Sequence, residues 1–262
     1  MSDDEILMHE IDTQLPVADF SHSSPCSAAN RVFVTLSGPN FRINNGFETD
    51  DMEKLYSGLS EKRSETKQNE FPLIYLIAPA ETTFDQIRSA IRTAAKAGFA
   101  DIFLVTKRTP ASGNYLKHGL LLRLPTASGL SPPSIEPIFV RSDRDGSIFI
   151  NTGPSQEALD HCREKRSLPK LNETLDNYAA CARAGGFEPI AQIHIDSSAT
   201  YQRAIDVMNA MQRCHIRHIT FTDVTSTPHR TCQGMGKGKP GTPTQSPSAI
   251  PRPPQIVNPV KR

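Results

Sequence analysis

The side chains that could do chemistry in this chain are few, and the most suggestive pair belongs to one apolar run. Asp196 follows Ile190 to Ile195, where a carboxylate would stand at the carboxyl end of a strand. Open sheets commonly bind ligands at that edge, and His194 lies in the same run. A soluble α/β enzyme that uses these two residues is therefore one interpretation. The competing interpretation places Asp196 in the turn that leads into the next helix, and the matching position of a similar earlier segment is Pro79, which carries no acid.

Three neighbouring residues have the chemistry of metal ligands, namely Cys214, His215 and His218. A zinc site needs three or four convergent ligands, usually in spaced pairs, and no such pair accompanies them. We therefore expect a buried cysteine and two histidines at a helix end. The five cysteines lack a CxxC pair, which also argues against a dense disulfide framework. They are Cys26, Cys162, Cys181, Cys214 and Cys232.

Two runs near the carboxyl terminus resemble ligand motifs in composition only. Residues 234–239 (GMGKGK) lack the GxxxxGK[ST] spacing of a phosphate loop and follow no strand. Residues 250–254 (IPRPP) could form a polyproline II segment that docks on an aromatic groove, but such segments are more often linkers. The sequence has no GxSxG nucleophile elbow. We assign no catalytic, cofactor-binding or metal-binding residue and expect no cofactor.

The composition of the 262 residues limits the classes of function. The formal net charge is only +1, so no general attraction to nucleic acid or to an anionic membrane is implied. No run approaches the ~20 apolar residues of a membrane helix. The acidic start, Met1 to Glu5, lacks the basic and apolar regions of a signal peptide. We therefore expect no nucleic-acid partner and no direct membrane span in this sequence.

A strand-helix-strand unit that occurs twice must position these side chains. The first copy lies between Phe71 and Thr106 and the second between Glu188 and Thr222, at a constant offset of 117 residues. In each copy a proline opens an apolar run, and apolar residues at helical spacing follow it. Gly98 ends the first helix and His215 stands at the matching position of the second. Both residue types occur in left-handed conformations at helix ends.

A hairpin and a helix precede this unit. After Leu15-Pro16-Val17-Ala18, residues 31–36 and 41–43 alternate as two strands around a Ser-Gly-Pro-Asn turn. We expect a helix with one apolar stripe to follow, with Thr49 as its cap. The stripe consists of Met52, Leu55, Tyr56 and Leu59.

The second copy repeats this order with an insertion. Leu124-Pro125-Thr126-Ala127 precedes a second hairpin, at an offset of 107 residues from the first hairpin. Its strands are expected at 138–140 and 147–150. The next section is about ten residues longer than in the first copy, with one helical face formed by Ala158, Leu159 and Cys162 and a break near Pro169. A helix with a stripe from Leu171 to Ala182 should then run to Gly185-Gly186. Matched elements in the same order around an insertion indicate a duplication.

The pattern predicts an α+β fold of two tandem small two-layer modules, each a mixed sheet with two helices on one face. From residue 225 the chain has almost no contiguous apolar surface and is rich in Pro, Gly, Ser, Lys and Arg, which predicts a disordered tail. We expect an acidic lead at 1–14, a first domain at 15–108, a linker at 109–123, a second domain at 124–224 and the tail at 225–262.

The order of Leu-Pro-x-Ala, hairpin, helix, strand, helix and strand resembles the ExbD/TolR family. Ile195-Asp196 before the second helix and Val105-Thr106 after the last strand of the first copy add to the resemblance, which covers Leu15 to Thr106 and Leu124 to Asp223. It implies a non-enzymatic, partner-binding module of periplasmic type that serves proton-motive-force-linked transport of biopolymers or proteins across the bacterial envelope. The implied location is the bacterial inner membrane and periplasm. The implied partners are envelope proteins of a Ton- or Tol-type motor or peptidoglycan.

The sequence also departs from the family pattern. Family members carry an N-terminal membrane helix with an acidic residue used in proton coupling, and this sequence has neither, so proton coupling is not carried over. We expect the two copies to pair within the chain in place of the family's dimer, and a sheet edge to accept an extended partner segment. The alternatives are a soluble enzyme that uses Asp196 and a structural scaffold that has lost the transport function.

Overall fold

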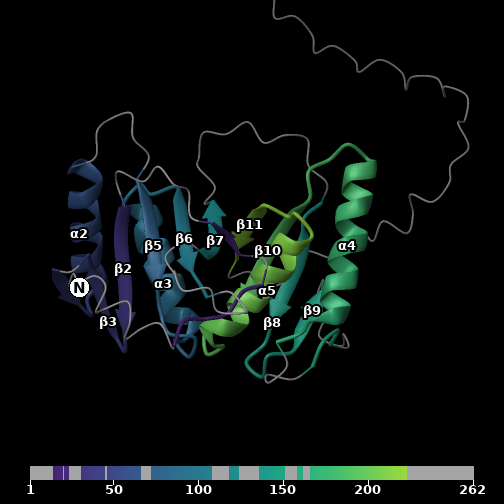
Figure 1. Cartoon of the computed structure of the whole chain (residues 1–262), viewed down its shortest axis with the longest axis horizontal. Helices are drawn as coiled ribbons and strands as arrows, with labels where there is room; N and C mark the ends of the chain where they lie inside the picture. The colour runs from purple at the N-terminus through teal and green to yellow at the C-terminus, as the bar shows by residue number, and fades with distance from the viewer. Residues whose placement is uncertain are drawn as a thin grey trace, which may run out of the picture. The chain divides into compact units, whose positions relative to one another are not determined.

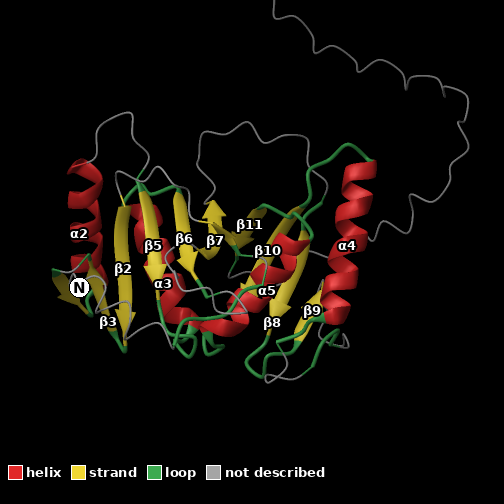
Figure 2. Cartoon of the chain, viewed as in Figure 1, coloured by secondary structure: helices red, strands yellow, loops and turns green. Residues whose placement is uncertain are grey.

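The structure, a computed structural model, has an α+β fold with four helices and two mixed sheets within the described residues (Figures 1 and 2). It describes residues 14–19, 21–23, 31–44, 46–65, 72–107, 118–123, 136–150, 158–161 and 166–222. All of them belong to one compact unit. The acidic lead before Gln14, the second Leu-Pro-x-Ala and the tail at 225–262 lie outside the described residues.

The first sheet has seven strands in the order β1-β7-β6-β5-β2-β3-β4. Its centre is parallel, because β5 pairs in parallel with both β2 and β6, and the remaining pairs are antiparallel. The strands are β1 (His22–Ser23), β2 (Arg31–Ser37), β3 (Asn40–Ile43), β4 (Phe47–Thr49), β5 (Leu73–Ile77), β6 (Asp101–Val105) and β7 (His118–Arg123).

Two helices, α2 (Met52–Glu65) and α3 (Phe84–Lys96), cover one face of this sheet. Their apolar stripes join alternate residues of the strands in the main hydrophobic core, as the period of two of a strand requires. The intervening Phe33, Tyr75 and Phe103 point to the opposite face and belong to a second cluster. Their rings lie at centroid distances of 5.3 Å and 5.2 Å. The sheet is therefore apolar on both faces, with its helices on one of them.

The second sheet has four strands in the order β11-β10-β8-β9. They are β8 (Ile138–Ser142), β9 (Ile148–Ile150), β10 (Ile190–Ile195) and β11 (His218–Phe221). Buried and half-buried residues alternate along β10, and the buried ones face α4 (Pro169–Ala184) and α5 (Tyr201–Arg213) in the main core. This sheet therefore carries its two helices on its apolar face.

The two modules share one topology, which confirms the predicted fold class for the described residues. The order β6-β5-β2-β3 in the first sheet matches β11-β10-β8-β9 in the second. α3 and α5 begin and end 117 residues apart. Gly98 has a φ of +87° and His215 a φ of +56°, so both helices are followed by the left-handed residue that the sequence predicts.

The predicted offset of 107 residues between the two hairpins is correct for the second strand of each hairpin but not for the first. Val34 pairs with Leu76 and Val140 pairs with Ile193 at the matching level, so β2 and β8 correspond at an offset of 106. Ile43 and Ile150, which face Val34 and Val140 across the hairpins, correspond at 107. The turn of the second hairpin is therefore one residue longer than that of the first.

The cap of α2 is Asp51 and not Thr49. The Asp51 carboxylate accepts a hydrogen bond of 2.8 Å from the backbone N–H of Glu53, in the first turn of the helix. The Thr49 hydroxyl accepts one of 3.0 Å from the N–H of Asp51. Both side chains have capping chemistry, but only Asp51 directly precedes the helix, so the prediction was wrong by two residues.

The helical face expected at residues 158–162 is also wrong where the structure describes it. Leu159 and Asp160 are extended along β9 and exchange backbone hydrogen bonds of 2.8 Å and 2.9 Å with Ile148. The Asp160 carboxylate accepts a bond of 2.8 Å from the N–H of Leu171 at the start of α4. Pro169 is the first residue of that helix, a position where its missing N–H costs nothing.

The expected linker at 109–123 contains a strand. β7 pairs with β6 in antiparallel register from Asp101 opposite Arg123 to Val105 opposite Gly119, and its Leu120 and Leu122 side chains are buried in the main core. Its place in the first sheet was missed because 12 residues, 106–117, separate it from β6, which is longer than the roughly two to five residues of a typical hairpin loop.

Candidate functional site

The two copies meet at a junction where the turns before α3 and α5 exchange backbone hydrogen bonds. The N–H of Phe84 donates to the carbonyl of Ala199 at 2.8 Å, and the N–H of Tyr201 donates to the carbonyl of Thr82 at 2.7 Å. Phe84 matches Tyr201 and Thr82 matches Ala199 at the offset of 117. The two hydrogen bonds therefore join equivalent positions of the two copies, with donor and acceptor copies exchanged.

A second pair of bonds follows the same rule. Asp85 donates its N–H to the carbonyl of Ser197 at 3.1 Å, and Gln202 donates to the carbonyl of Ala80 at 2.9 Å. Between the pairs, Thr83 and Thr200 form an antiparallel bridge. Helices leave their first N–H groups without intrahelical partners, and here each copy satisfies those of the other. The contact is reciprocal, as in an isologous dimer.

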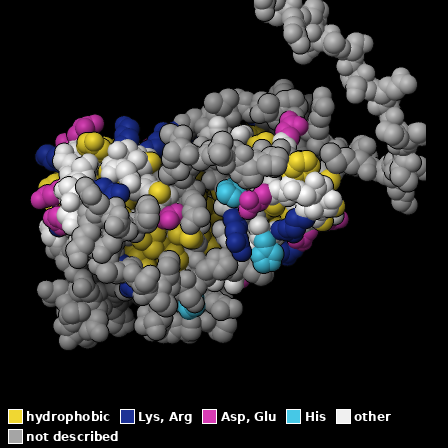
Figure 3. Space-filling model, turned by 90° about the horizontal axis from the view of Figure 1, so that it is seen from above, with side chains coloured by type: hydrophobic (Ala, Val, Ile, Leu, Met, Phe, Trp, Pro, Cys, Tyr) yellow, Lys and Arg dark blue, Asp and Glu magenta, His cyan; other side chains and the backbone are white. Residues whose placement is uncertain are grey.

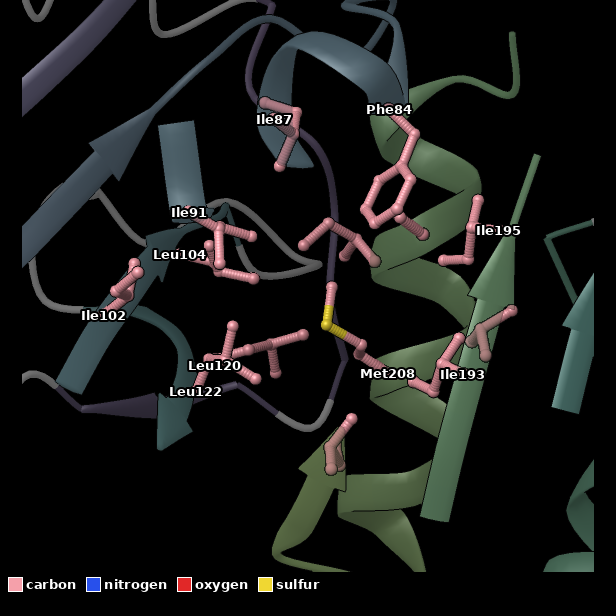
Figure 4. Close-up of a cluster of buried hydrophobic side chains, with 14 of the residues drawn as sticks. Phe84, Ile87, Ile91, Ile102, Leu104, Leu120, Leu122, Ile193, Ile195 and Met208 are labelled. Carbon is pink, nitrogen blue, oxygen red and sulfur yellow. The ribbon is translucent and has the colours of Figure 1, made fainter. Parts of the chain in front are cut away.

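An apolar cluster lies behind these bonds (Figure 4). Ile91 of α3 lies beside residues of β6 and β7, and Met208 of α5 lies between these and the residues of β10, all within one continuous core. Phe84 also contacts Phe221 of β11, with a centroid distance of 5.4 Å. Burial of apolar surface stabilises such a contact by ~25 cal/mol per Å², so the two copies stabilise one another.

Leu15-Pro16-Val17-Ala18, which we call the strap, ties the first copy to the second. Lys107, just after β6, donates to the carbonyl of Pro16 at 2.9 Å and accepts from the N–H of Ala18 at 3.0 Å. On the other side, the Gln202 carboxamide accepts from the N–H of Val17 at 2.8 Å and donates to its carbonyl at 3.0 Å. The main chain of the strap is therefore held on one side by the backbone of Lys107 and on the other by the side chain of Gln202.

A buried carboxylate organises the side of the strap that faces α5. Asp206 accepts hydrogen bonds from Gln202 at 2.8 Å and from Arg166 at 3.1 Å, and Arg166 also donates to the Val17 carbonyl at 2.6 Å. Asp206 is only 6% exposed. Burial raises its pKa from 3.8 to about 6, although Arg166, Gln202 and Arg203 oppose the shift. The ionisation of Asp206 is thus coupled to the contacts of Gln202 and Arg166 with the strap.

A groove of about 600 Å³ lies away from this junction, at the edge of the first sheet. It runs between β4 and one face of α2, with Ile43 and Phe47 on the strand side and Lys54, Gly58 and Glu61 on the helix side. Phe47 is 44% exposed, which is unusual for so large an apolar side chain. Asn44, Gly46, Ser57 and Lys62 complete the lining.

Gly58 lets the Ile43 side chain pack directly against α2 at one side of this groove. A Cβ at this position would come within 2.7 Å of Cδ1 of Ile43 and 3.7 Å of the Phe47 ring. Leu55 and Leu59 of α2 occupy the same buried places as Leu171 and Leu175 of α4, at an offset of 116. The second copy therefore has Thr174 where the first has Gly58.

The two residues singled out for catalysis have structural contacts. The Asp196 carboxylate accepts from the N–H and the hydroxyl of Ser198 at 2.8 Å and 2.6 Å, in the turn that leads to α5. These bonds lower its pKa. Nδ1 of His194 lies 3.0 Å from the carbonyl oxygen of Thr222.

The residues with metal-ligand chemistry are directed to different partners. Cys214 is buried and its thiol donates to Asp176 at 3.0 Å; burial and this carboxylate raise the pKa of Cys214 to about 12. Nε2 of His218 lies 3.2 Å from Glu188, and His215 is exposed. Among the described residues, no three His, Cys, Asp or Glu side chains converge as metal ligands would.

Surface charge shows both signs in the face drawn in Figure 3, where basic and acidic side chains lie near one another at either end of the view. This agrees with a formal net charge of +1. The longest described helix, α4, has 16 residues, and no helix in the described part of the chain has the length and apolar composition needed to cross a membrane.

Sequence reasoning missed the residues that make the junction and the groove. Gln202 and Asp206 are ordinary polar residues of α5, and Arg166 lies in the segment before α4. Only the strap, recognised as a repeated motif, marks their location. Phe47 and Gly58 carry no motif. An exposed aromatic residue in a short strand is visible only once the neighbours are known. Comparisons of this chain with protein-family models, curated proteins and solved structures found no match.

Proposed function

We propose that this chain is an ExbD/TolR-like, non-enzymatic component of proton-motive-force-linked transport of biopolymers or proteins across the bacterial envelope. In this role it binds envelope proteins of a Ton- or Tol-type motor, or peptidoglycan, as a module of periplasmic type. The two copies take the place of the two subunits of the family's dimer.

The observation that carries the proposal is the reciprocal set of backbone bonds between the copies. Phe84 with Ala199 and Tyr201 with Thr82 are mates at the offset of 117. A duplicated domain that pairs in this way resembles a dimer joined into one chain. The strap supports the same view, because the Leu-Pro-x-Ala motif that carries the family resemblance lies at this junction and bonds to both copies.

The contacts of Asp196 favour this proposal over the enzyme. Its carboxylate is engaged with Ser198 in a turn, which is the role of a helix-leading residue. Its repeat mate, Pro79, has no side chain that could share a catalytic task. A scaffold without a transport partner remains the alternative to be separated by experiment.

The test is cross-linking of the full chain in its native host, followed by purification and mass spectrometry. We expect recovery of a proton-channel subunit of a Ton- or Tol-type motor, or co-sedimentation of the purified chain with isolated peptidoglycan. Asp196→Asn is the matched control, because it keeps an acceptor oxygen for Ser198 and should leave both interactions unchanged.

Two outcomes would contradict the proposal. If the chain recovers neither a motor subunit nor peptidoglycan while it remains folded, the scaffold alternative is correct. If Asp196→Asn abolishes turnover of a substrate without altering any interaction, the enzyme alternative is correct.

A further inference from the structure

The face of α2 that lines the groove carries a positive charge at one end and a negative charge at the other, so it is complementary to an antiparallel copy of the same face. Lys54, Gly58 and Glu61 lie one and two turns apart, so they share one face of the helix. Lys54 and Glu61 are exposed, and neither has an ion-pair partner among the residues that the structure describes. The midpoint between them falls at Ser57 and Gly58.

Two antiparallel copies of such a helix satisfy one another. A two-fold axis at Ser57–Gly58 sets Lys54 of each copy opposite Glu61 of the other, which gives two equivalent ion pairs from one surface. Ser57, at the centre, is small and exposed, so a second helix can approach at this point, while the Gly58 side of α2 is packed against Ile43 of its own chain. Lys62 pairs with Glu65 at 2.9 Å on its own helix; the Glu65 hydrogen bond, and to a smaller extent the charge of Glu61, raise the pKa of Lys62, but Lys62 and Glu61 form no ion pair.

The apolar part of the groove lies beside the same axis. Phe47 is 44% exposed and is one of two large apolar side chains exposed in the described part of the chain. It belongs to β4, which is the last strand of the first sheet. Exposed edge strands and exposed aromatic side chains both mark surfaces that associate. Burial of Phe47 against a second copy would remove it from water.

The second copy of the fold lacks this surface. At the offset of 116 that superposes the buried leucines, Lys54 corresponds to Lys170, Gly58 to Thr174 and Glu61 to Asn177. The outer side of β9 is occupied by the chain itself, because Ile148 forms a bridge with Asp160. The described part of each chain therefore has one such surface, and a surface that pairs only with itself closes after two chains.

We propose that a second copy of this chain docks in the β4–α2 groove, with the two α2 helices antiparallel about Ser57–Gly58 and Lys54 of each chain paired with Glu61 of the other. The chain is thereby a closed homodimer of an internally paired molecule. The inference does not depend on the proposed transport function, since it concerns a different surface.

The experiment is sedimentation equilibrium of the full chain at several micromolar concentrations, with charge-reversal variants. Wild type should show a monomer–dimer equilibrium. Lys54→Glu and Glu61→Lys should each weaken the dimer by about tenfold or more, because each places like charges in apposition. The double variant should restore the wild-type equilibrium, because it re-forms both pairs with reversed sign. Lys170→Glu on α4 is the matched control and should leave the equilibrium unchanged.

Circular dichroism and thermal unfolding of each variant show whether it is folded. All three substituted residues are at exposed helix positions, where effects on folding stay small. A wild type that is monomeric throughout would overturn the proposal, as would an oligomer larger than two. A dimer that Lys54→Glu leaves intact, or one that the folded double variant fails to restore, would show that another surface or partner is involved and would equally overturn it.

Discussion

Asp206 is the residue whose ionisation is most closely tied to the structure. Gln202 and Arg166 both bond to its Oδ1 atom and both also bond to Val17 of the strap. Burial raises its pKa from 3.8 to about 6. Because the folded protein holds this proton more tightly than the unfolded chain, Asp206 stabilises the fold fully below pH ~3.8, and the contribution is lost as pH rises through ~6.

Asp206→Asn should remove this pH dependence. The amide oxygen of Asn can still accept from Gln202 and Arg166, but the side chain no longer titrates. Between pH 4 and pH 7, the free energy of unfolding of wild type should fall relative to that of the variant by up to ~3 kcal/mol. Denaturant titrations at several pH values measure the difference. A constant difference across this range would show that Asp206 does not titrate as described.

The left-handed residues after α3 and α5 allow a second comparison. Gly98 has no atom closer than 3.9 Å to an added Cβ, so only its φ of +87° opposes a side chain. Gly98→Ala should therefore lower the free energy of unfolding by roughly 1–2 kcal/mol. His215 has the same left-handed conformation, at a φ of +56°, and His215→Gly removes the strain of its side chain there. This substitution should raise the free energy of unfolding by up to ~1 kcal/mol. Equilibrium unfolding of both variants measures these changes. If the two substitutions change the free energy of unfolding in the same direction, the left-handed backbone conformation does not explain their effects.

At the scale of elements, β7 joins the first sheet at a point that tolerates only glycine. A Cβ on Gly119 would meet the backbone oxygen of Leu104 and the ring of Phe103, and neither can move away freely. Gly119→Ala should therefore destabilise the protein by roughly 1–3 kcal/mol. Gly46→Ala is the control, since no atom lies within 4 Å of its added Cβ, and it should stay within ~0.5 kcal/mol of wild type. Thermal unfolding that ranks the two variants in the opposite order would contradict the sheet assignment.

The elements that the sequence predicted correctly are those with strong periodicity. α3 and α5 bury a continuous stripe and were expected between the prolines that open each unit and Gly98 or His215, because period 3.6 and the helix-end signals agree. The segment at 158–160 failed because a few apolar residues fit a helix and a strand equally well. Contacts with Ile148 decide its conformation, and such contacts cannot be read from local sequence.

At the scale of the molecule, repetition carried more information than any motif. The offset of 117 located both strand-helix-strand units, and the topology of the two sheets follows it. The same offset did not specify how the copies meet. The bonds of Phe84 and Tyr201 are made by backbone atoms, so side-chain identity gives no signal for them. The contacts of the strap and the groove were likewise not predicted, since both depend on residues brought together from distant parts of the chain.

The most direct test of the account is amide hydrogen exchange, followed by NMR, at the starts of α3 and α5. The N–H groups of Phe84, Asp85, Tyr201 and Gln202 occupy first-turn positions, which have no intrahelical acceptors, and here they bond to the other copy. We expect these four amides to exchange as slowly as those of β5 and β10. If they exchange at the rate of exposed amides while both strands stay protected, the two copies do not pair in this way and the central claim is wrong.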